Sequence, residues 1–187
     1  MDARCHPEII ERLQDFAEIV FPFRSSGITY ESISCHPDIF LYQDATHLIV
    51  APNAPKELFL ALEESKIEYE KGESGIGSEL SNSCFYNCVS TQENFFHREG
   101  YSDTSVLKAN ERKRFVSLPQ SYTRCSMLPL SKDSFITSDQ GIHKTLQQHG
   151  FNSFCFSPEL NDSSIIVSSF ARNAKSQLYM AGGNWSC

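Results

Sequence analysis

The sequence predicts an α/β fold in which one unit, made of two strands, a helix and a returning strand, is repeated along the chain. Three stretches show this order of apolar strand patterns, turn residues and one amphipathic helix pattern. His36, Cys88, Cys125 and Ser164 mark equivalent points of successive units. Their spacing corresponds to a period of roughly 40 residues, which is typical of a repeat array.

The first unit covers residues 36–73. Its two expected strands are "DIFLYQ" and "HLIVAP". Pro55 suits the first turn of a helix, and the following "KELFLALEES" places its leucines on one face. The segment "KIEYEKG" alternates apolar and polar residues, so we expect it to return as the third strand.

The second unit covers residues 86–120. We expect strands in "NCVSTQ" and "NFFHRE" and a closing strand in "RFVSLP". Asp103 precedes the helical segment, and its carboxylate can accept the free backbone N–H groups of a first helical turn. The sequence therefore predicts a helix from Asp103 to about Asn110.

The third unit covers residues 125–159 and has the clearest pattern. "CSMLPL" and "SFIT" are expected strands, and "FNSFCFSP" is the expected closing strand. Between them we expect a helix with Asp139 near its N-cap and Gly150 at its C-terminal end.

The two ends of the chain fit the repeat less well. "EIIERLQDF" predicts a short N-terminal helix, and the segment after it could supply part of a unit. The last unit lacks a helix pattern, so its tail is diverged, truncated or read out of frame. We expect a single domain over residues 1–187, with a partial unit before 36 and units at about 36–73, 86–120, 125–159 and 164–187.

Composition excludes several functional classes. The formal net charge of −7 and the absence of a basic cluster argue against a nucleic-acid partner. No apolar run approaches the ~20 residues needed to cross a bilayer, and the N-terminus does not read as a signal peptide. The seven cysteines follow no regular framework, so we expect reduced thiols and a cytoplasmic location. No cofactor and no metal site are expected, because the C-x3-C pair at Cys84 and Cys88 has no second pair at zinc-finger spacing.

The stretch "SCHPDIFLYQ" combines a histidine, a carboxylate and a cysteine at the start of a strand. One interpretation is structural, because Pro37 fixes the backbone and Asp38 can close an Asx-type turn. The other is a site in which His36 and Asp38 face a cysteine from another unit. Cys125 is the candidate, and its alternative is a buried cysteine at a strand start.

The repeat, together with "HPDIFLY", "YNCVST" and "PQSYTRCSMLPLSKDSFITSDQGIHKTLQQHG", resembles the pentein α/β-propeller. This is the fold of enzymes that modify guanidino groups, such as amidinotransferases and arginine and agmatine deiminases, and of non-catalytic ribosome-associated proteins. The local sequence is closest to an uncharacterised bacterial family of that superfamily. The resemblance covers about residues 30–160 and implies repeated ββαβ units around a pseudo-fivefold axis.

The resemblance also implies a site. First strands of the units would line a central channel, so their first residues would converge. In the enzymes a cysteine attacks the guanidinium carbon, a histidine relays protons and carboxylates hold the cation. By this resemblance Cys125, His36 and Asp38 are the expected catalytic residues, and Asn87 and Arg124 are expected to bind substrate.

Two function classes stay open from the sequence. The first is a guanidino- or amidino-group hydrolase or transferase, and the second is a non-catalytic module that binds a small molecule or a protein. The enzymes take their cysteine from the last unit, where "GGNWSC" offers Cys187 as an alternative nucleophile. An incomplete ring would expose strand edges, which favours a homodimer. The enzyme class requires a cysteine about 3–4 Å from His36.

Overall fold

The computed structural model describes residues 1–156, and within them the chain is a mixed α and β structure. Its strands form three separate three-stranded sheets, in the order β1-β2-β3, β4-β5-β6 and β7-β8-β9. In every sheet the first two strands pair antiparallel and the last two pair parallel. A helix connects each parallel pair, so the repeated ββαβ unit predicted from the sequence is confirmed three times.

The first unit begins after a single 3-10 turn, η2. Its antiparallel strands are in register from Leu41 opposite Val50 to Gln43 opposite Leu48. The apolar face of its helix is buried through Leu58 and Leu62, as the spacing predicted. The elements are η2 (Pro37–Ile39), β1 (Leu41–Gln43), β2 (Leu48–Val50), α2 (Lys56–Glu64) and β3 (Glu70–Lys71).

The second and third units have helices whose ends were predicted correctly. The side chains of Asp103 and Asp139 accept hydrogen bonds from the first turns of α3 and α5. Gly150 follows the C-cap residue of α5 with a positive φ of 83°, which glycine adopts without strain. The elements are β4 (Val89–Ser90), β5 (Asn94–His97), α3 (Thr104–Ala109), β6 (Arg114–Ser117), α4 (Thr123–Ser126), β7 (Met127–Pro129), β8 (Ser134–Thr137), α5 (Gln140–Gln148) and β9 (Asn152–Cys155).

Two strand predictions were wrong at the positions that matter for the site. The segment "DIFLYQ" starts as a 3-10 turn, and its strand begins only at Leu41. The segment "CSMLPL" starts inside the helical turn α4, and its strand begins at Met127. In both units, therefore, a short helical turn stands immediately before the first strand.

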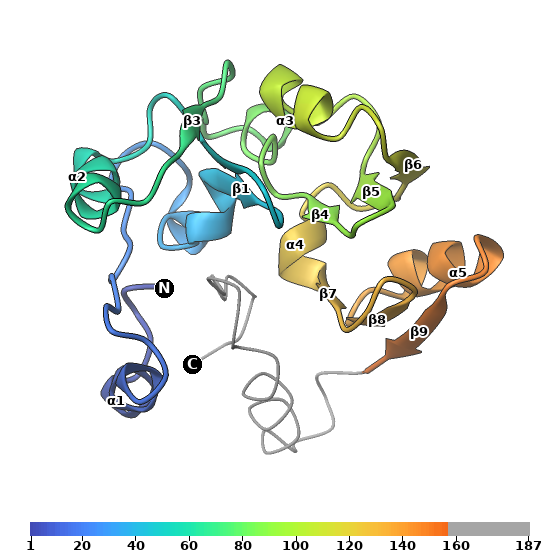
Figure 1. The fold of residues 1–187 in the computed structure, drawn as a ribbon, viewed down its shortest axis with the longest axis horizontal. Helices are drawn as coiled ribbons and strands as arrows, with labels where there is room; N and C mark the ends of the chain where they lie inside the picture. The colour runs from blue at the N-terminus through green and yellow to red at the C-terminus, as the bar shows by residue number, and fades with distance from the viewer. Residues whose placement is uncertain (157–187) are drawn as a thin grey trace.

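The three units lie side by side along an arc (Figure 1). In each unit the first strand lies toward the inside of the arc, and the third strand and the helix lie toward the outside. The turns that precede β1, β4 and β7 are consequently brought to the same inner region.

Apolar side chains hold neighbouring units together. One core cluster joins the first unit to one face of the second through residues such as Tyr42 and Phe95. The other face of the second unit packs on the third, where the rings of Phe96, Phe135 and Phe151 lie 5.0–5.5 Å apart. Alternate residues of β5 therefore face different neighbours, as the strand period of two requires.

The N-terminal segment packs beside the first unit. Its helix α1 (Pro7–Gln14) confirms the predicted N-terminal helix, and Asp2 forms a parallel bridge with Phe23. Two further 3-10 turns, η1 (Glu31–Ile33) and η3 (Leu80–Asn82), lie in the connections. Within residues 1–156 no helix has the length and apolar character required to cross a membrane. The predicted unit at 164–187 lies outside the described residues.

Candidate active site

The turn η2 presents His36 and Asp38 from the beginning of the first unit. Pro37 occupies the first position of the turn, and the residue before a proline is held in an extended conformation, as His36 is. Backbone bonds from Ile39 to His36 and from Phe40 to Pro37 close the turn. The expected Asx-type bond does not form, because the carboxylate of Asp38 bonds to other units instead.

Asn87, which precedes β4, fixes the position of Cys125. Its side-chain oxygen accepts hydrogen bonds from the backbone N–H groups of Arg124 and Cys125, at 2.8 and 3.2 Å. Its backbone oxygen accepts the N–H groups of Thr123 and Arg124. The free N–H groups of the short helix α4 are thus satisfied from another unit, which explains why residues 123–126 are helical.

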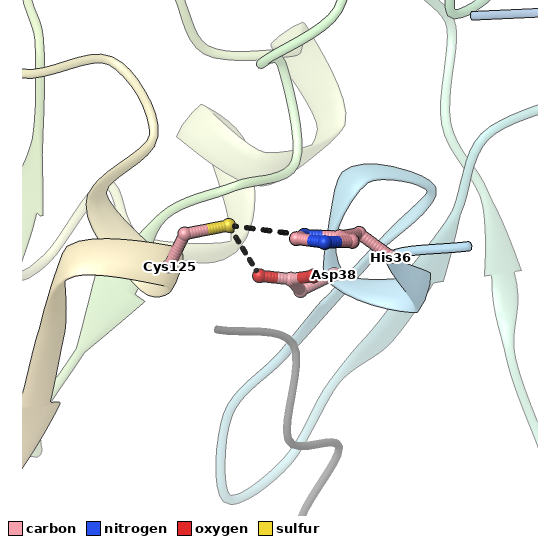
Figure 2. Close-up of side chains that lie close together, drawn as sticks. All are labelled: His36, Asp38 and Cys125. Atoms are coloured by element: carbon pink, nitrogen blue, oxygen red, sulfur yellow. Dashed lines mark hydrogen bonds between the residues drawn. The ribbon is translucent and has the colours of Figure 1, made fainter. Parts of the chain in front are cut away.

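The side chains of Cys125, Asp38 and His36 meet (Figure 2). Cys125 Sγ lies 2.9 Å from Asp38 Oδ2 and 3.9 Å from His36 Nδ1. Asn87 Nδ2 donates to Asp38 Oδ2 at 2.9 Å and lies 3.2 Å from Cys125 Sγ. The segments that precede the first strands of the three units therefore all contribute to the same cluster, with two residues from the first unit and one each from the second and third.

The cluster is buried, and burial sets its protonation. His36 and Asp38 are only 4% and 2% exposed. Burial raises the pKa of Asp38, although hydrogen bonds from Cys125 and Asn87 oppose this. Burial and the adjacent Asp38 raise the pKa of Cys125 well above its ordinary value. The thiol of Cys125 is placed to donate its proton to Asp38 Oδ2.

Asp2 is a member of the site that sequence analysis missed. Its Oδ2 lies 3.6 Å from His36 Nε2, on the side of the ring opposite Cys125. Burial alone would raise the pKa of Asp2, but hydrogen bonds from Arg4 outweigh it and keep this carboxylate ionised. An N-terminal acid carries no local signal for such a role, since the contact depends on the packing of the N-terminal segment.

The other predicted residues are placed differently. Asn87 lies in the cluster, but both atoms of its amide are already bonded to protein groups. Arg124 is partly exposed, and its guanidinium has no hydrogen bond or ion pair with any residue of the described part. Cys84 and Cys88 are buried free thiols, and neither bonds to His36, Asp38 or Cys125. Cys187 lies outside the described residues.

The model of one protein family matches residues 1–163 of the chain, and that family is described as a family of unknown function (DUF6873). The chain belongs to the DUF6873 family. The matched residues include every member of the cluster from Asp2 to Cys125. No curated protein matches this DUF6873 chain.

The cluster of this DUF6873 protein combines a nucleophile, a base and two carboxylates. His36 lies between Asp2 and Cys125, the arrangement in which a third group orients a base toward its nucleophile. Asp38 adds a buried carboxylate beside the sulfur, and this group accepts a hydrogen bond from it. Such a set can bind a planar cation, carry out thiol chemistry on it, or ligate a metal ion.

Proposed function

We propose that this chain is a guanidino- or amidino-group hydrolase or transferase of pentein-like fold, with Cys125 as nucleophile. The observation that carries the proposal is the meeting of Cys125 with Asp38 and His36, at 2.9 and 3.9 Å. A catalytic base acts within hydrogen-bond reach, about 2.6–3.2 Å, and such contacts are often longer before substrate binds, so a sulfur 3.9 Å from His36 Nδ1 is compatible with this role. Three units with one topology, arranged along an arc, support a ring of such units.

The charge of the site suits a cationic amidine or guanidinium group. Asp38 is a buried carboxylate, and within residues 1–156 its Oδ1 has no hydrogen-bond partner, so a planar cation would supply the missing donors. The same cation, paired with Asp38, would offset the negative charge beside Sγ. It would therefore lower the pKa of the Cys125 thiol. The substrate would thereby generate the thiolate that attacks it.

The proposed chemistry assigns one role to each residue. The proton of the Cys125 thiol passes to His36, the resulting thiolate attacks the guanidinium carbon, and His36 delivers that proton to the departing amine or ammonia. The result is an S-amidino enzyme, in which the new C–S bond replaces the broken C–N bond. Water, deprotonated by His36, then attacks the same carbon and releases a urea-type product and the thiol. In a transferase an acceptor amine replaces water. Arg124 is proposed to bind an anionic group of the substrate, and Asn87 to hold Asp38 and Cys125 in place.

A matched pair of alkylating probes tests the proposal. Chloroacetamidine carries the planar cation, whereas chloroacetamide is neutral, and mass spectrometry identifies the labelled cysteine. We expect chloroacetamidine to label Cys125 at least about 10-fold faster than chloroacetamide, because Asp38 pairs with the cation. Asp38→Asn should abolish this preference, and His36→Ala should slow both probes. Cys155→Ser serves as the control.

One observation favours a second candidate, a non-catalytic module of the same fold that binds a small molecule or a protein. The thiol of Cys125 is partly buried and bonded to Asp38, as a structural cysteine can be. Slow labelling of Cys125 by both probes, without a preference for the cation, would contradict the enzyme and leave this candidate.

A further inference from the structure

We propose that His36, Asp38 and Cys125 form a three-ligand binding site for a thiophilic divalent cation, best fitted by Zn²⁺. No metal site was predicted from the sequence, because these ligands come from two units and lack any zinc-finger spacing. In the folded chain one ligand atom of each residue lies within 4.8 Å of the other two. This inference rests on the cluster and not on the proposed guanidino chemistry.

The distances fit a tetrahedral ion with small adjustments. Zinc bonds of about 2.3 Å to sulfur and about 2.0–2.2 Å to nitrogen and oxygen place tetrahedral ligand atoms roughly 3.4–3.6 Å apart. The sulfur of Cys125 is 2.9 Å from the Asp38 oxygen and 3.9 Å from the His36 nitrogen. The sulfur–oxygen distance would lengthen and the sulfur–nitrogen distance would shorten, each by about half an ångström, to reach this geometry. The ligand atoms of His36 and Asp38, which lie within 4.8 Å of each other, would close on the same ion.

The unpaired oxygen of Asp38 is an independent indication of a ligand. Its Oδ1 is buried and has no hydrogen-bond partner in the described part of the chain, whereas buried polar atoms in proteins are nearly always paired. A metal ion bound to Oδ1, or to both oxygens of the carboxylate, would give this oxygen atom a partner.

The surrounding residues provide the support that zinc ligands need. Asp2 faces His36 Nε2, which leaves Nδ1 directed toward Cys125 and available as a ligand. Asn87 holds both Asp38 and the α4 backbone at Cys125. Mixed nitrogen, oxygen and sulfur donors favour zinc over magnesium or calcium. Three protein ligands leave a fourth position for water or another small ligand.

The binding step is balanced by release of a proton. The thiol of Cys125 loses the proton that it shares with Asp38, a zinc–sulfur bond replaces the S–H bond, and the proton passes to solvent. Zinc and a cationic amidine would compete for the same atoms, so bound zinc would prevent labelling by chloroacetamidine.

Cobalt substitution tests the site in the full chain after treatment with a chelator. We expect one equivalent of Co²⁺ to give a thiolate-to-cobalt charge-transfer band that Zn²⁺ bleaches. Cys125→Ser should remove the band, and Asp38→Asn should weaken Zn²⁺ affinity more than about 100-fold, because even loss of an outer partner costs 10–100-fold. Asp2→Asn should weaken it about 10-fold. Cys155→Ser is the matched control and should keep the band.

A second measurement needs no variant and so does not depend on correct folding of a mutant. Saturating Zn²⁺ should protect Cys125 of the native chain from chloroacetamide at least about 10-fold and leave Cys155 unaffected. Absence of the cobalt band, or a band that persists in Cys125→Ser, would overturn the zinc site. Zinc binding without any preference for chloroacetamidine would leave the zinc site standing and remove the guanidino enzyme. A preference for chloroacetamidine without zinc binding would leave the guanidino enzyme standing and remove the zinc site.

Discussion

At the scale of single residues, Asn87 links the three units of the site. Its side chain bonds the carboxylate of Asp38 from the first unit and the backbone of α4 in the third. An asparagine side chain offers two N–H donors and one carbonyl acceptor, and it does so without adding charge. A buried amide with complete hydrogen bonding therefore fixes where two reactive groups meet.

Asn87→Ala tests this linking role. We expect it to lower the free energy of unfolding by about 2–3 kcal/mol, because buried polar groups on Asp38 and α4 lose their partners. Urea unfolding at neutral pH measures the change. Asn152→Ala, at an exposed asparagine of β9, should change stability by less than about 0.5 kcal/mol. Equal effects of the two substitutions would show that Asn87 has no such role.

His97 is a buried histidine that sequence analysis did not assign, and it makes stability depend on pH. Its ring donates from Nε2 to the backbone oxygen of Ser121 and accepts at Nδ1 from Ser102. Burial lowers the pKa of His97 from 6.5 to about 4, against the hydrogen bond to Ser121. Between these two pH values the unfolded chain binds a proton that the folded chain does not, so stability falls as pH falls.

The expected contribution of His97 is fully present above pH 6.5 and decreases by about 3 kcal/mol at pH 4, at 1.36 kcal/mol for each pKa unit. Because Asp38 and other groups also titrate there, the measured quantity is the difference between the native chain and His97→Gln. Urea unfolding across this range should give a flatter pH profile for the variant. Parallel profiles would contradict a neutral, buried His97.

At the scale of elements, helix caps differ in what they connect. Asp103 and Asp139 cap α3 and α5 in equivalent units. Within the described residues, the side chain of Asp139 accepts a hydrogen bond only from its own helix, from the backbone N–H of Ile142. Asp103 bonds Ser105 in α3 and also accepts the backbone N–H groups of Glu73 and Ser74, at the end of the first unit.

We therefore expect Asp103→Ala to destabilise the chain more than Asp139→Ala. Loss of a cap alone costs about 1 kcal/mol, which is the value expected for Asp139→Ala. Asp103→Ala should cost about 3 kcal/mol, because two further backbone groups of the first unit lose their partner. Chemical unfolding of the two variants provides the comparison. A smaller loss for Asp103→Ala would mean that the bond between units contributes nothing.

The elements also show which features could be predicted from sequence. The caps Asp103 and Asp139 and the glycine at 150 act within a few residues of their own helices, so local patterns revealed them. The helical turn at Cys125 could not be found, because Asn87 from another unit satisfies its N–H groups. His36 and Asp38 were chosen correctly as neighbours of Cys125, from their equivalent positions in the repeat and from the central channel that the pentein resemblance implies. Asp2 was missed because no repeat includes it.

At the scale of the whole molecule, the second unit is shared between two cores. Cys88 belongs to the cluster that joins it to the first unit, and Phe96 to the cluster that joins it to the third. In arrays where each unit contacts only its neighbours, stability is close to a sum of unit and interface contributions. The third unit can then open from the second while the first two stay packed.

Phe135→Leu should make this separate opening visible. Phe135 is buried against Phe96 and Phe151, and its shortening should weaken that interface by about 1–2 kcal/mol. Labelling of Cys125 under native conditions should then accelerate about 10-fold, since 1.4 kcal/mol corresponds to a factor of ten in an opening equilibrium.

Labelling of Cys88 is the internal reference, because this thiol is buried in the other cluster and should keep its rate within about twofold. Leu130→Ala, at an exposed residue of the third unit, is the matched control and should alter neither rate. Mass spectrometry follows both cysteines in one sample at fixed pH. Equal acceleration of Cys88 and Cys125 would mean that the units open in a single step. Faster labelling of Cys125 alone would mean that access to the cluster depends on how the third unit packs on the second. The aromatic contacts that hold these two units together would then also keep the site closed to the probe.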